Sequence, residues 1–338
     1  MIATAKPPGP RNPPIIGHLR AFRSNPVKFL LKLQAEFGDL VHFRAGPVRA
    51  YFFNDPEWIK DILVTRQGLF TKSRILQRAR VLLGEGLLTS EGAFHMRQRR
   101  LVQPAFHRDR LIGYAATMGE YAVRARERWR DGAVVNVADE MMRVTLAIVG
   151  KTLFSADIQS EATEIGKALT DVLAMFDVLV LPFSEYFQKL PIAPVRRFER
   201  ARATLDSIIY RLISERRASG KDYGDLLSML LLSVDEDEDG SGMNDQQVRD
   251  EALTLILAGH ETTANALTWT WYLLSQNPSC AARLQAEVDE VIGDRTPVFD
   301  DFPNLRYTEM VLAESMRFYP PAWGVGRSPK EDIEIAGI

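Results

Sequence analysis

The stretch Ala258-Gly259-His260-Glu261-Thr262-Thr263 lies in the middle of the longest periodic segment of this 338-residue chain. That segment, Gln246–Ser275, predicts a single helix about 45 Å long. Apart from His260 and Glu261 it is almost free of charge between Ala252 and Leu274. Because a helix that is apolar on all sides is usually buried, we expect this helix to cross the core of a domain.

The central stretch is unusual because it places polar groups and a glycine inside an apolar helix. Gly259 costs about 1 kcal/mol in a helix interior, and buried polar side chains cost more unless they are hydrogen-bonded. The Thr262 hydroxyl can bond to the Ala258 carbonyl and bend the helix. These features predict a local break. A flat or small ligand and a simple packing kink explain such a break equally well.

Two other roles for this helix are disfavoured. His260-Glu261 begins a His-Glu-x-x-His zinc motif, but Ala264 stands at the second histidine position, so the ligand set is incomplete. A transmembrane span is disfavoured because polar residues lie near the centre and no basic clusters flank the segment. We expect the helix to begin after Asn244, with Gln247 completing a capping box, and to end at Asn277-Pro278.

The composition is that of a globular protein. Hydrophobic residues make up 46% and charged residues 25% of the chain, and the formal net charge is −2, which argues against nucleic-acid binding. The one cysteine, Cys280, cannot form an internal disulfide and favours a reducing, cytoplasmic location. No apolar run of signal-peptide or anchor length begins the chain, so we expect a soluble protein without a membrane span.

Helix dominates the rest of the pattern, and the predicted fold class is mainly α, or α+β, in one domain of residues 1–338. Pro7–Pro14 predicts an extended lead-in that lies on the body of the protein. Leu40–Phe43 and Ala50–Phe53 predict two strands, and Asp332–Ile338 predicts the start of another. The other predicted helices are Pro26–Phe37, Pro56–Thr65, Phe94–Phe106, Arg110–Arg130, Ala138–Leu153, Glu161–Phe176, Val195–Ser219, Asp225–Val234, Ser279–Ile292 and Tyr307–Phe318.

The acidic run that begins at Asp235 has the spacing of a partial calcium-binding loop. Asp235, Asp237, Asp239 and Gly240 fit the first four conserved positions of such a loop. The last position should be a bidentate glutamate, and it is Gln246. We therefore favour a plain solvated loop between two helices.

Two further pairs of polar residues have helical spacing. Glu314 and Arg317 lie at i and i+3, which by itself indicates a common surface ion pair. His95 and Arg99 lie one turn apart on one face of another predicted helix, a spacing suited to gripping an anionic group. A solvated basic face is the alternative for the second pair. A nucleic-acid patch is less favoured, because aromatic stacking platforms are lacking.

The order of these motifs along the chain is more specific than any one of them. A proline-rich lead is followed by Leu83-Gly84-Glu85-Gly86-Leu87-Leu88-Thr89, the helix of His95 and Arg99, the Ala-Gly-His-Glu-Thr-Thr helix, and Glu314-x-x-Arg317 before Tyr-Pro-Pro. Over essentially all 338 residues this order resembles the cytochrome P-450 family of haem-thiolate monooxygenases, in its soluble bacterial type. The resemblance implies the fold of that family, a helical bundle with a small sheet.

The resemblance also implies roles for the central helix. Thr262 and Glu261 would be catalytic, the hydroxyl by hydrogen-bonding the activated oxygen and the carboxyl by relaying protons. Ala258 and Gly259 would contact the cofactor and widen the groove where dioxygen binds. No metal ligand is identified among residues 1–338.

Other positions receive roles by the same resemblance. His95, Arg99 and Arg327 would bind the haem propionates, with His95 in place of the family's more usual tryptophan. Glu314 and Arg317 would form an internal, structural ion pair. The substrate pocket would be lined by Ala322–Val325, the loop around Ile75–Leu88 and Met175–Phe183, and in particular by Leu87, Ala322, Trp323 and Val325.

The implied reaction inserts one oxygen atom from O2 into an apolar organic substrate, such as a fatty acid, a terpenoid, a steroid or a xenobiotic. Haem b would be the cofactor, and electrons would come from NAD(P)H through a ferredoxin or a flavoprotein reductase. The basic region Arg97–Arg110 could dock such a partner. We expect a monomer.

The axial cysteine of this family lies in a Phe-x-x-Gly-x-x-x-Cys-x-Gly loop well after Glu-x-x-Arg, and residues 1–338 contain no such loop. Cys280 precedes Glu314 and lacks the glycines and phenylalanine, so we interpret it as an ordinary helix-start residue. We therefore expect a C-terminally truncated fragment, without the cysteine loop and last helix, that is inactive because the thiolate drives the chemistry. The alternative is a haem-free helical binding or interaction protein.

Overall fold

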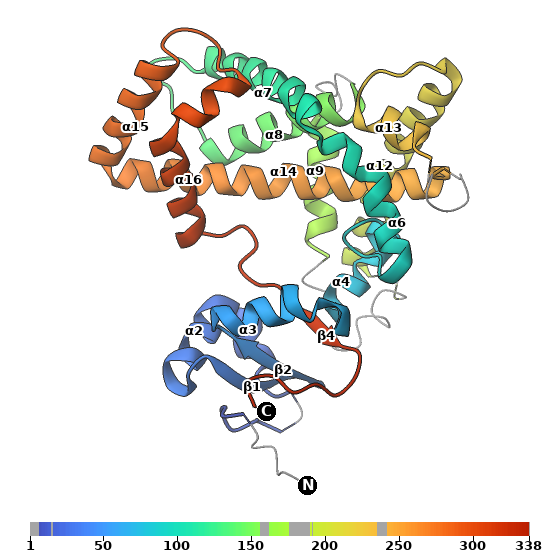
Figure 1. The fold of residues 1–338 in the computed structure, drawn as a ribbon, viewed down its shortest axis with the longest axis vertical. Coiled ribbons are helices and arrows are strands. Elements are labelled where there is room, and N and C mark those ends of the chain that lie inside the picture. The colour runs from blue at the N-terminus through green and yellow to red at the C-terminus, as the bar shows by residue number, and fades with distance from the viewer. Residues whose placement is uncertain are drawn as a thin grey trace. The chain divides into compact units, whose positions relative to one another are not determined.

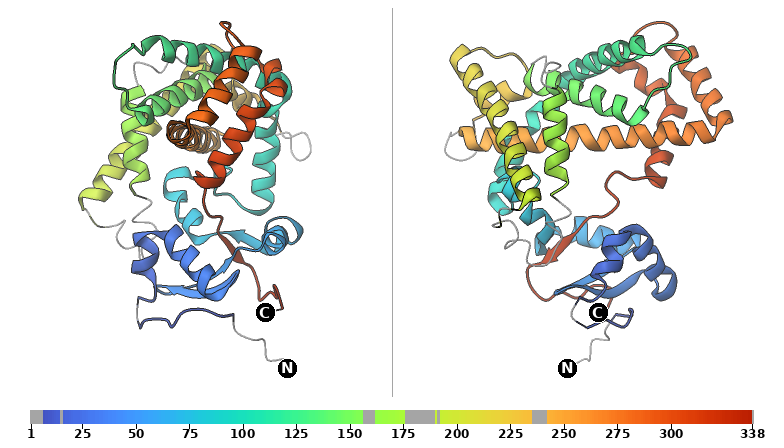
Figure 2. Two further views of the ribbon diagram at one scale, coloured as in Figure 1. Left: turned by 90° about the vertical axis from the view of Figure 1, so that its left-hand side faces the viewer. Right: turned by 180° about the vertical axis from the view of Figure 1, so that it is seen from behind.

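The computed structural model describes residues 7–14, 16–155, 162–175, 190, 192–234 and 242–337. The chain divides into two compact units, shown in Figure 1 and Figure 2. Unit 1 comprises Met1–Gln77, Val180–Tyr186 and Gly324–Ile338, and unit 2 comprises Arg78–Leu179 and Phe187–Trp323. Each unit has its own hydrophobic core.

Unit 1 is built around an antiparallel hairpin. β1 (Leu40–Ala45) pairs with β2 (Val48–Phe53), and Leu40 lies opposite Phe53. Both strands were predicted, and each is longer than the sequence indicated. The hairpin packs on helices α1 (Leu19–Ser24) and α2 (Pro26–Phe37), whose Phe22 and Phe29 rings contact the buried Phe43 of β1. The other helical elements of the first 78 residues are α3 (Pro56–Lys60), a π-helical turn (Asp61–Thr65), a 3-10 turn (Gln67–Leu69) and α4 (Arg74–Arg78).

The proline-rich lead-in lies against β1, as predicted. The His42 N–H donates to the Pro8 carbonyl at 2.9 Å. A side chain at Gly9 would overlap the His42 carbonyl oxygen. Glycine therefore lets this extended segment approach the strand closely.

A second small sheet in unit 1 corrects the prediction for the end of the chain. β3 (Phe70–Lys72) pairs antiparallel with β4 (Arg327–Pro329), whereas the predicted strand Asp332–Ile338 is wrong. Its described residues form coil and a turn in which Ala336 has a φ of 55°. The strand at this end of the chain instead forms at Arg327–Pro329, where β3 supplies a partner, and no described strand pairs with residues 332–337.

Unit 2 is almost entirely helical. Its longest helix, α14 (Asp245–Gln276), packs against α8 (Val137–Phe154), α12 (Ala193–Ser219) and α16 (Arg306–Phe318), and Figure 1 shows it crossing the whole unit. The mainly helical class with small antiparallel sheets is therefore confirmed. The other elements are α5 (Arg80–Leu83), α6 (Gly92–Val102), a 3-10 turn (Gln103–Phe106), α7 (Arg108–Arg128), α9 (Ala162–Leu173), α13 (Leu226–Leu232), α15 (Pro278–Val291) and a 3-10 turn (Phe299–Asn304).

Several helices pack into one core in unit 2. Apolar side chains of α8, α9, α12 and α13 meet the first half of α14 in a continuous cluster that includes Leu169, Leu205, Leu230 and Leu253. Across the described ranges no helix is both long and apolar enough to span a membrane. The whole acidic run, residues 235–240, lies outside the described residues, as does the 176–183 part of the predicted pocket segment.

Candidate active site on helix α14

Helix α14 begins and ends where the sequence predicts. The Asn244 side chain accepts the Gln247 N–H, and the Gln247 side chain accepts the Asn244 N–H, each at 2.9 Å. This is the predicted capping box. The helix has 32 residues, or about 48 Å at 1.5 Å per residue, and ends at Asn277, before the proline that starts α15.

The two halves of α14 differ in exposure. Residues 248–257 are buried, with Leu255 half-buried, so the predicted burial on all sides is right for this half. From Ala258 onward one face is exposed, and there the prediction is wrong, because no side chain in the described part of the chain covers it. We call this surface the open face. Its residues are Ala258, Gly259, Thr262 and Thr263, which are exposed within two turns of one another.

The predicted local break in α14 is wrong, although its predicted hydrogen bond exists. The Thr262 hydroxyl donates to the Ala258 carbonyl at 2.5 Å, yet the helix is continuous from Asp245 to Gln276. A carbonyl oxygen has two lone pairs, so it accepts the hydroxyl without giving up its place in the helix ladder. At Gly259 an added Cβ would meet only Val149, at 3.5 Å. The open face therefore lies on an intact helix.

His260 and Glu261 stand side by side with opposite shifts in pKa. The His260 ring is buried, and its Nε2–H donates to the Met142 carbonyl at 3.1 Å. Burial lowers the pKa of this imidazole and so favours the neutral ring. Glu261 is half-buried, and burial raises the pKa of its carboxyl. A carboxyl that holds its proton more tightly than usual is suited to passing that proton on.

His95 and Arg99 lie on α6, one turn apart, as predicted. Arg99 is exposed, and His95 is half-buried with its Nδ1 3.3 Å from the Ser90 hydroxyl. Arg327 lies on β4, which belongs to unit 1, whereas α6 belongs to unit 2. The predicted grouping of these three side chains around one anionic ligand therefore stays a prediction.

Glu314 and Arg317 form the predicted ion pair. Arg317 donates two hydrogen bonds to the Glu314 carboxylate, Nε to Oε2 at 2.7 Å and Nη2 to Oε1 at 2.8 Å. The bidentate pair lowers the pKa of Glu314. Both side chains are more than half exposed. The pairing is thus observed, while the internal structural role stays a prediction.

The predicted substrate-contacting residues are distributed over both units. Leu87 is half-buried beside α14, while Ala322 and Trp323 are exposed after α16 in unit 2. Val325 is exposed and belongs to unit 1. The expected loop at Ile75–Leu88 is wrong for its first part, because α4 and α5 occupy most of it, and only residues 84–91 form a loop. A run of Leu, Arg and Gln residues before Gly84 has high helix propensity, which explains the difference.

A buried ion-pair network in the first half of α14 was not foreseen. The Arg249 guanidinium donates to Asp206 of α12 at 2.7 Å, to Asp250 at 2.9 Å and to the Leu82 carbonyl at 2.7 Å. The Arg249 and Asp250 side chains are 5% and 6% exposed. Because each charge faces an opposite charge and further donors, the network can remain buried.

Two carboxylates of this half also hold a loop, residues 84–89. The Glu85 N–H donates to Asp250 Oδ2 at 2.9 Å, and the Leu87 N–H donates to Glu251 Oε2 at 3.0 Å. Side chains at Gly84 and Gly86 would overlap the Asp250 carboxylate and the Thr254 hydroxyl. The two glycines, one residue apart in a Leu-Gly-Glu-Gly-Leu sequence, were the available signal for this close approach.

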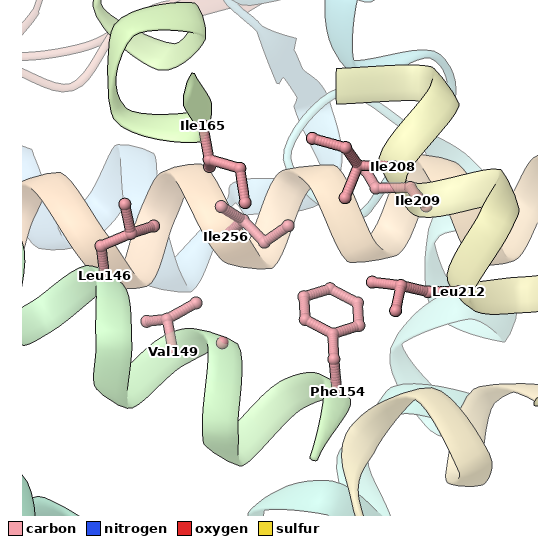
Figure 3. Close-up of a pocket in the computed structure, with 9 residues that line it drawn as sticks. Leu146, Val149, Phe154, Ile165, Ile208, Ile209, Leu212 and Ile256 are labelled. Carbon is pink, nitrogen blue, oxygen red and sulfur yellow. The ribbon is translucent and has the colours of Figure 1, made fainter. Parts of the chain in front are cut away.

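A small cavity lies in the core of unit 2, away from the predicted pocket residues. Its volume is about 20 Å3, and its lining is entirely apolar. Figure 3 shows Ile256 of α14 facing it across from Phe154 and Leu212. It shares no lining residue with the predicted substrate pocket. The lining residues are Leu146, Val149, Gly150, Phe154, Ile165, Ile208, Ile209, Leu212 and Ile256.

Cys280 lies at the start of α15, not on the open face. The neighbouring Cys280 side chain raises the pKa of the Tyr307 phenol, and the Arg283 guanidinium lies 4.1 Å from the centre of that ring. Cys280 is 18 positions after Thr262, most of them along one continuous helix, so the two are separated by roughly 20 Å or more. This position agrees with the interpretation of Cys280 as an ordinary helix-start residue.

The comparisons with known proteins point to one family. The model of the Cytochrome P450 family matches residues 7–338. Cyclooctatin synthase of Streptomyces melanosporofaciens is 41% identical over 96% of this chain and 71% of its own length. Cyclooctat-9-en-7-ol 5-monooxygenase of the same organism is 36% identical over 97% of this chain and 71% of its own. Pentalenene oxygenase of Streptomyces avermitilis is 36% identical over 96% and 72%.

The chain therefore belongs to the cytochrome P450 family, as the order of its motifs predicts. By family it is an oxidoreductase, a haem-dependent monooxygenase that acts on an organic substrate. The cofactor of the family is haem b, and its electrons come from NAD(P)H through redox partners.

The residues of unit 2 fit such a cofactor in part. Ala258 and Gly259 are adjacent, small and exposed, as close approach of a flat group requires, and Arg99 exposes a cation suited to a carboxylate. A thiolate donor is not supplied at the open face, because the one cysteine of residues 1–338 is Cys280 on α15.

Proposed function

We propose that this protein oxygenates a cyclic terpenoid hydrocarbon or alcohol. The names of the three relatives, cyclooctatin synthase, cyclooctat-9-en-7-ol 5-monooxygenase and pentalenene oxygenase, support this substrate class over fatty acids, steroids and xenobiotics. The observation that carries the proposal is the open face of α14, where a helix with a buried first half exposes Ala258, Gly259 and Thr262.

Haem, when bound, supplies the activation of dioxygen that lets one oxygen atom enter a C–H or C=C bond. Within this chain, Ala258 and Gly259 leave room beside the helix. The Thr262 hydroxyl, now bonded to the Ala258 carbonyl, would turn to donate its proton toward the open face. Glu261, whose raised pKa keeps a proton available, would replace it.

His95, Arg99 and Arg327 are proposed to hold the propionates of the haem. The support for Arg99 is its exposed guanidinium on α6, because a guanidinium binds a carboxylate in a fixed geometry. His95 lies one turn before Arg99 on the same helix, and its half-buried ring lies beside the Ser90 hydroxyl. Glu314 and Arg317 are proposed to support this region without touching the reacting atoms.

A ferredoxin or a flavoprotein reductase is proposed to deliver the electrons to a monomeric, cytoplasmic enzyme. In the basic region Arg97–Arg110, Arg99 and Arg108 are exposed and could meet an acidic partner. Arg110 is engaged inside the unit, since its Nη1 donates to the Gly224 carbonyl at 2.9 Å. The docking face would therefore be smaller than the sequence alone suggests.

Replacing Thr262 tests the proposed catalytic role. In a haem-loaded form that carries the family's cysteine loop, supplied with redox partners and pentalenene, Thr262→Ala should lower the rate of product formation by about a hundredfold, the usual contribution of a positioned proton donor. Thr263→Ala is the matched control, because Thr263 is the neighbouring hydroxyl on the same face. Equal losses of rate in both variants would contradict a special role for Thr262. Failure of the wild type to oxidise pentalenene would contradict the proposed substrate class.

Cys280 is proposed not to bind iron. A preparation of residues 1–338 mixed with haem, reduced and exposed to carbon monoxide, should show no thiolate-type absorbance band. Appearance of the band, and its loss in Cys280→Ser, would overturn this assignment. A chain that takes up no haem at all would favour the alternative of a haem-free helical binding protein.

A further inference from the structure

The 84–89 loop is fixed to α14 more firmly than a surface connection needs. Its N–H groups at Glu85 and Leu87 are bound by Asp250 and Glu251, and Glu251 is fully buried, at 0% exposed. Hydrogen bonds to buried carboxylates are stronger than those between neutral groups. The loop therefore has one defined position along the helix.

That position lies in line with the open face. Glu251, Leu255, Ala258 and Thr262 follow one another at i, i+4, i+7 and i+11, a spacing that keeps all four within about 40° of a single line along α14. The rise from Glu251 is about 10 Å to Ala258 and about 16 Å to Thr262. The loop held by Glu251 thus lies at the N-terminal end of the strip whose other end is the open face.

Two leucines of the loop lie at the anchored position or next to it. Leu87 is half-buried, and Leu88 is 38% exposed. An apolar molecule that lies on the open face and extends toward the N-terminus of α14 would meet these leucines about 10 Å from Ala258. A shift of the loop along the helix would shift the molecule by the same amount.

Resting on the proposed function, we propose that Glu251 is a positioning residue for the substrate. By binding the Leu87 N–H it fixes the end wall of the apolar strip. It thereby selects which carbon of a cyclic terpenoid lies opposite Ala258 and Thr262. Glu251 touches neither the substrate nor the cofactor in this role.

Glu251 and Asp250 differ in how they can be tested. Asp250 also accepts from Arg249 and Gln246, so its loss would disrupt the buried ion pair and the fold with it. Glu251 can be changed to Gln, which keeps a side-chain oxygen to accept the Leu87 N–H, or to Ala, which removes the acceptor. Asp245→Asn is the matched control, because Asp245 is an acid of the same helix whose ion pair with Arg217 is exposed.

The experiment measures hydrogen exchange of the loop and the reaction products in a haem-loaded form that carries the family's cysteine loop. Amide hydrogen exchange at residues 85–89 should be at least about tenfold faster in Glu251→Ala, with most protection restored in Glu251→Gln. With pentalenene as substrate, Glu251→Ala should raise KM about tenfold and change the ratio of oxygenated products, while kcat changes by less than about twofold. Asp245→Asn should change neither measurement.

Three results would overturn the proposal. Unchanged exchange in Glu251→Ala would show that the carboxylate does not hold the loop. Faster exchange with unchanged KM and product ratio would show that the loop does not position the substrate. An equal loss of kcat and kcat/KM would indicate a damaged reaction centre. If the wild type oxidises no terpenoid, the substrate class fails, and the exchange measurement still decides whether Glu251 fixes the loop.

Discussion

The first and second halves of α14 form one continuous helix but treat polar side chains in opposite ways. In the first half Arg249 and Asp250 are buried, and their charges are matched by each other, by Asp206 and by backbone groups. In the second half Glu261 is half-buried, and the described residues offer its carboxyl no hydrogen bond or ion pair. Thr262 bonds only to its own helix.

This difference suits the first half of α14 to a supporting role and the second half to contact with a ligand. Satisfied buried charges hold the helix and the 84–89 loop in one arrangement, which a reaction site needs from its surroundings. Polar groups without fixed partners remain available to a ligand. Under the proposed function, the first half of the helix supports the site and the second half carries its reactive groups.

Removing Arg249 should produce the largest effect on stability, because it disrupts the buried ion pairs in the first half of α14. Arg249→Leu leaves the Asp250 carboxylate buried without its cation, and such a loss costs about 3–5 kcal/mol. Guanidinium denaturation should show a correspondingly lower free energy of unfolding. Arg217→Leu is the control, since its pair with Asp245 is exposed and should change stability little. Similar losses in both variants would contradict the contrast between buried and exposed pairs.

Gly86→Ala should have the next largest effect. The new Cβ would overlap the Thr254 hydroxyl and lie 2.7 Å from the Asp250 carbonyl oxygen, which cannot move without bending α14. Overpacking of this kind costs about 1–3 kcal/mol. Gly113→Ala on α7 is the opposite control, because nothing lies within 4 Å of its Cβ and alanine favours helix. Thermal unfolding should show a lower Tm for the first variant and a higher one for the second.

A smaller effect on stability is expected from Gly259→Ala in the second half of α14. Gly259→Ala adds a Cβ that meets only Val149, at 3.5 Å, so it should stabilise the haem-free chain by up to about 1 kcal/mol through helix propensity. Turnover by the haem-loaded enzyme should fall, because the added methyl group narrows the open face. A variant that is less stable would show that this half tolerates no added atoms.

The smallest effects should appear in the pH dependence of stability at the boundary between the halves. Burial lowers the pKa of His260 below its ordinary 6.5, so the unfolded chain binds a proton that the folded chain does not. The His260 contribution to stability is therefore present above pH 6.5 and is lost as pH falls toward the lowered pKa. His260→Gln should flatten this part of the curve of unfolding free energy against pH. An unchanged slope of unfolding free energy against pH would show that the His260 imidazole does not cause this pH dependence.

Glu261 should make the stability of the protein depend on pH in the opposite direction. Burial raises the pKa of its carboxyl above 4.5, so the folded chain keeps a proton that the unfolded chain has released. Stability is therefore lost as pH rises from 4.5 toward the raised pKa. Glu261→Gln should remove this loss, as followed by denaturation at each pH. A variant that is equally sensitive to rising pH would show that another group titrates.

Local features of the fold could be predicted from the sequence because they depend on neighbouring residues. The capping box at Asn244, the stop at Asn277 and the Thr262 bond to Ala258 all follow from short-range chemistry and are confirmed. The predicted strand Asp332–Ile338 failed because strand formation depends on which edge is free. The strand that does form near the end of the chain, Arg327–Pro329, pairs with Phe70–Lys72, about 260 positions earlier in the chain.

The candidate site shows the same limit. Motif order singled out Ala258, Gly259 and Thr262 as candidate site residues, but it gave no sign that one face of the helix would be exposed there or that Arg249, Asp250 and Glu251 would be buried. Charged residues near the start of a helix are usually exposed, and only contacts with Asp206 and residues 84–89 make their burial possible. Whether the face after Ala258 is exposed depends on which other parts of the chain pack against the helix. The hydrophobic periodicity of the helix itself does not contain that information.

The two glycines of the 84–89 loop have a consequence for laboratory evolution of this protein. Random libraries that spread substitutions evenly over residues 84–89 would lose many members at Gly84 and Gly86, where no side chain has room. Leu87 and Leu88, whose backbone is held but whose side chains are partly exposed, are the positions to diversify. A library confined to these two codons would sample new product profiles while keeping the scaffold folded.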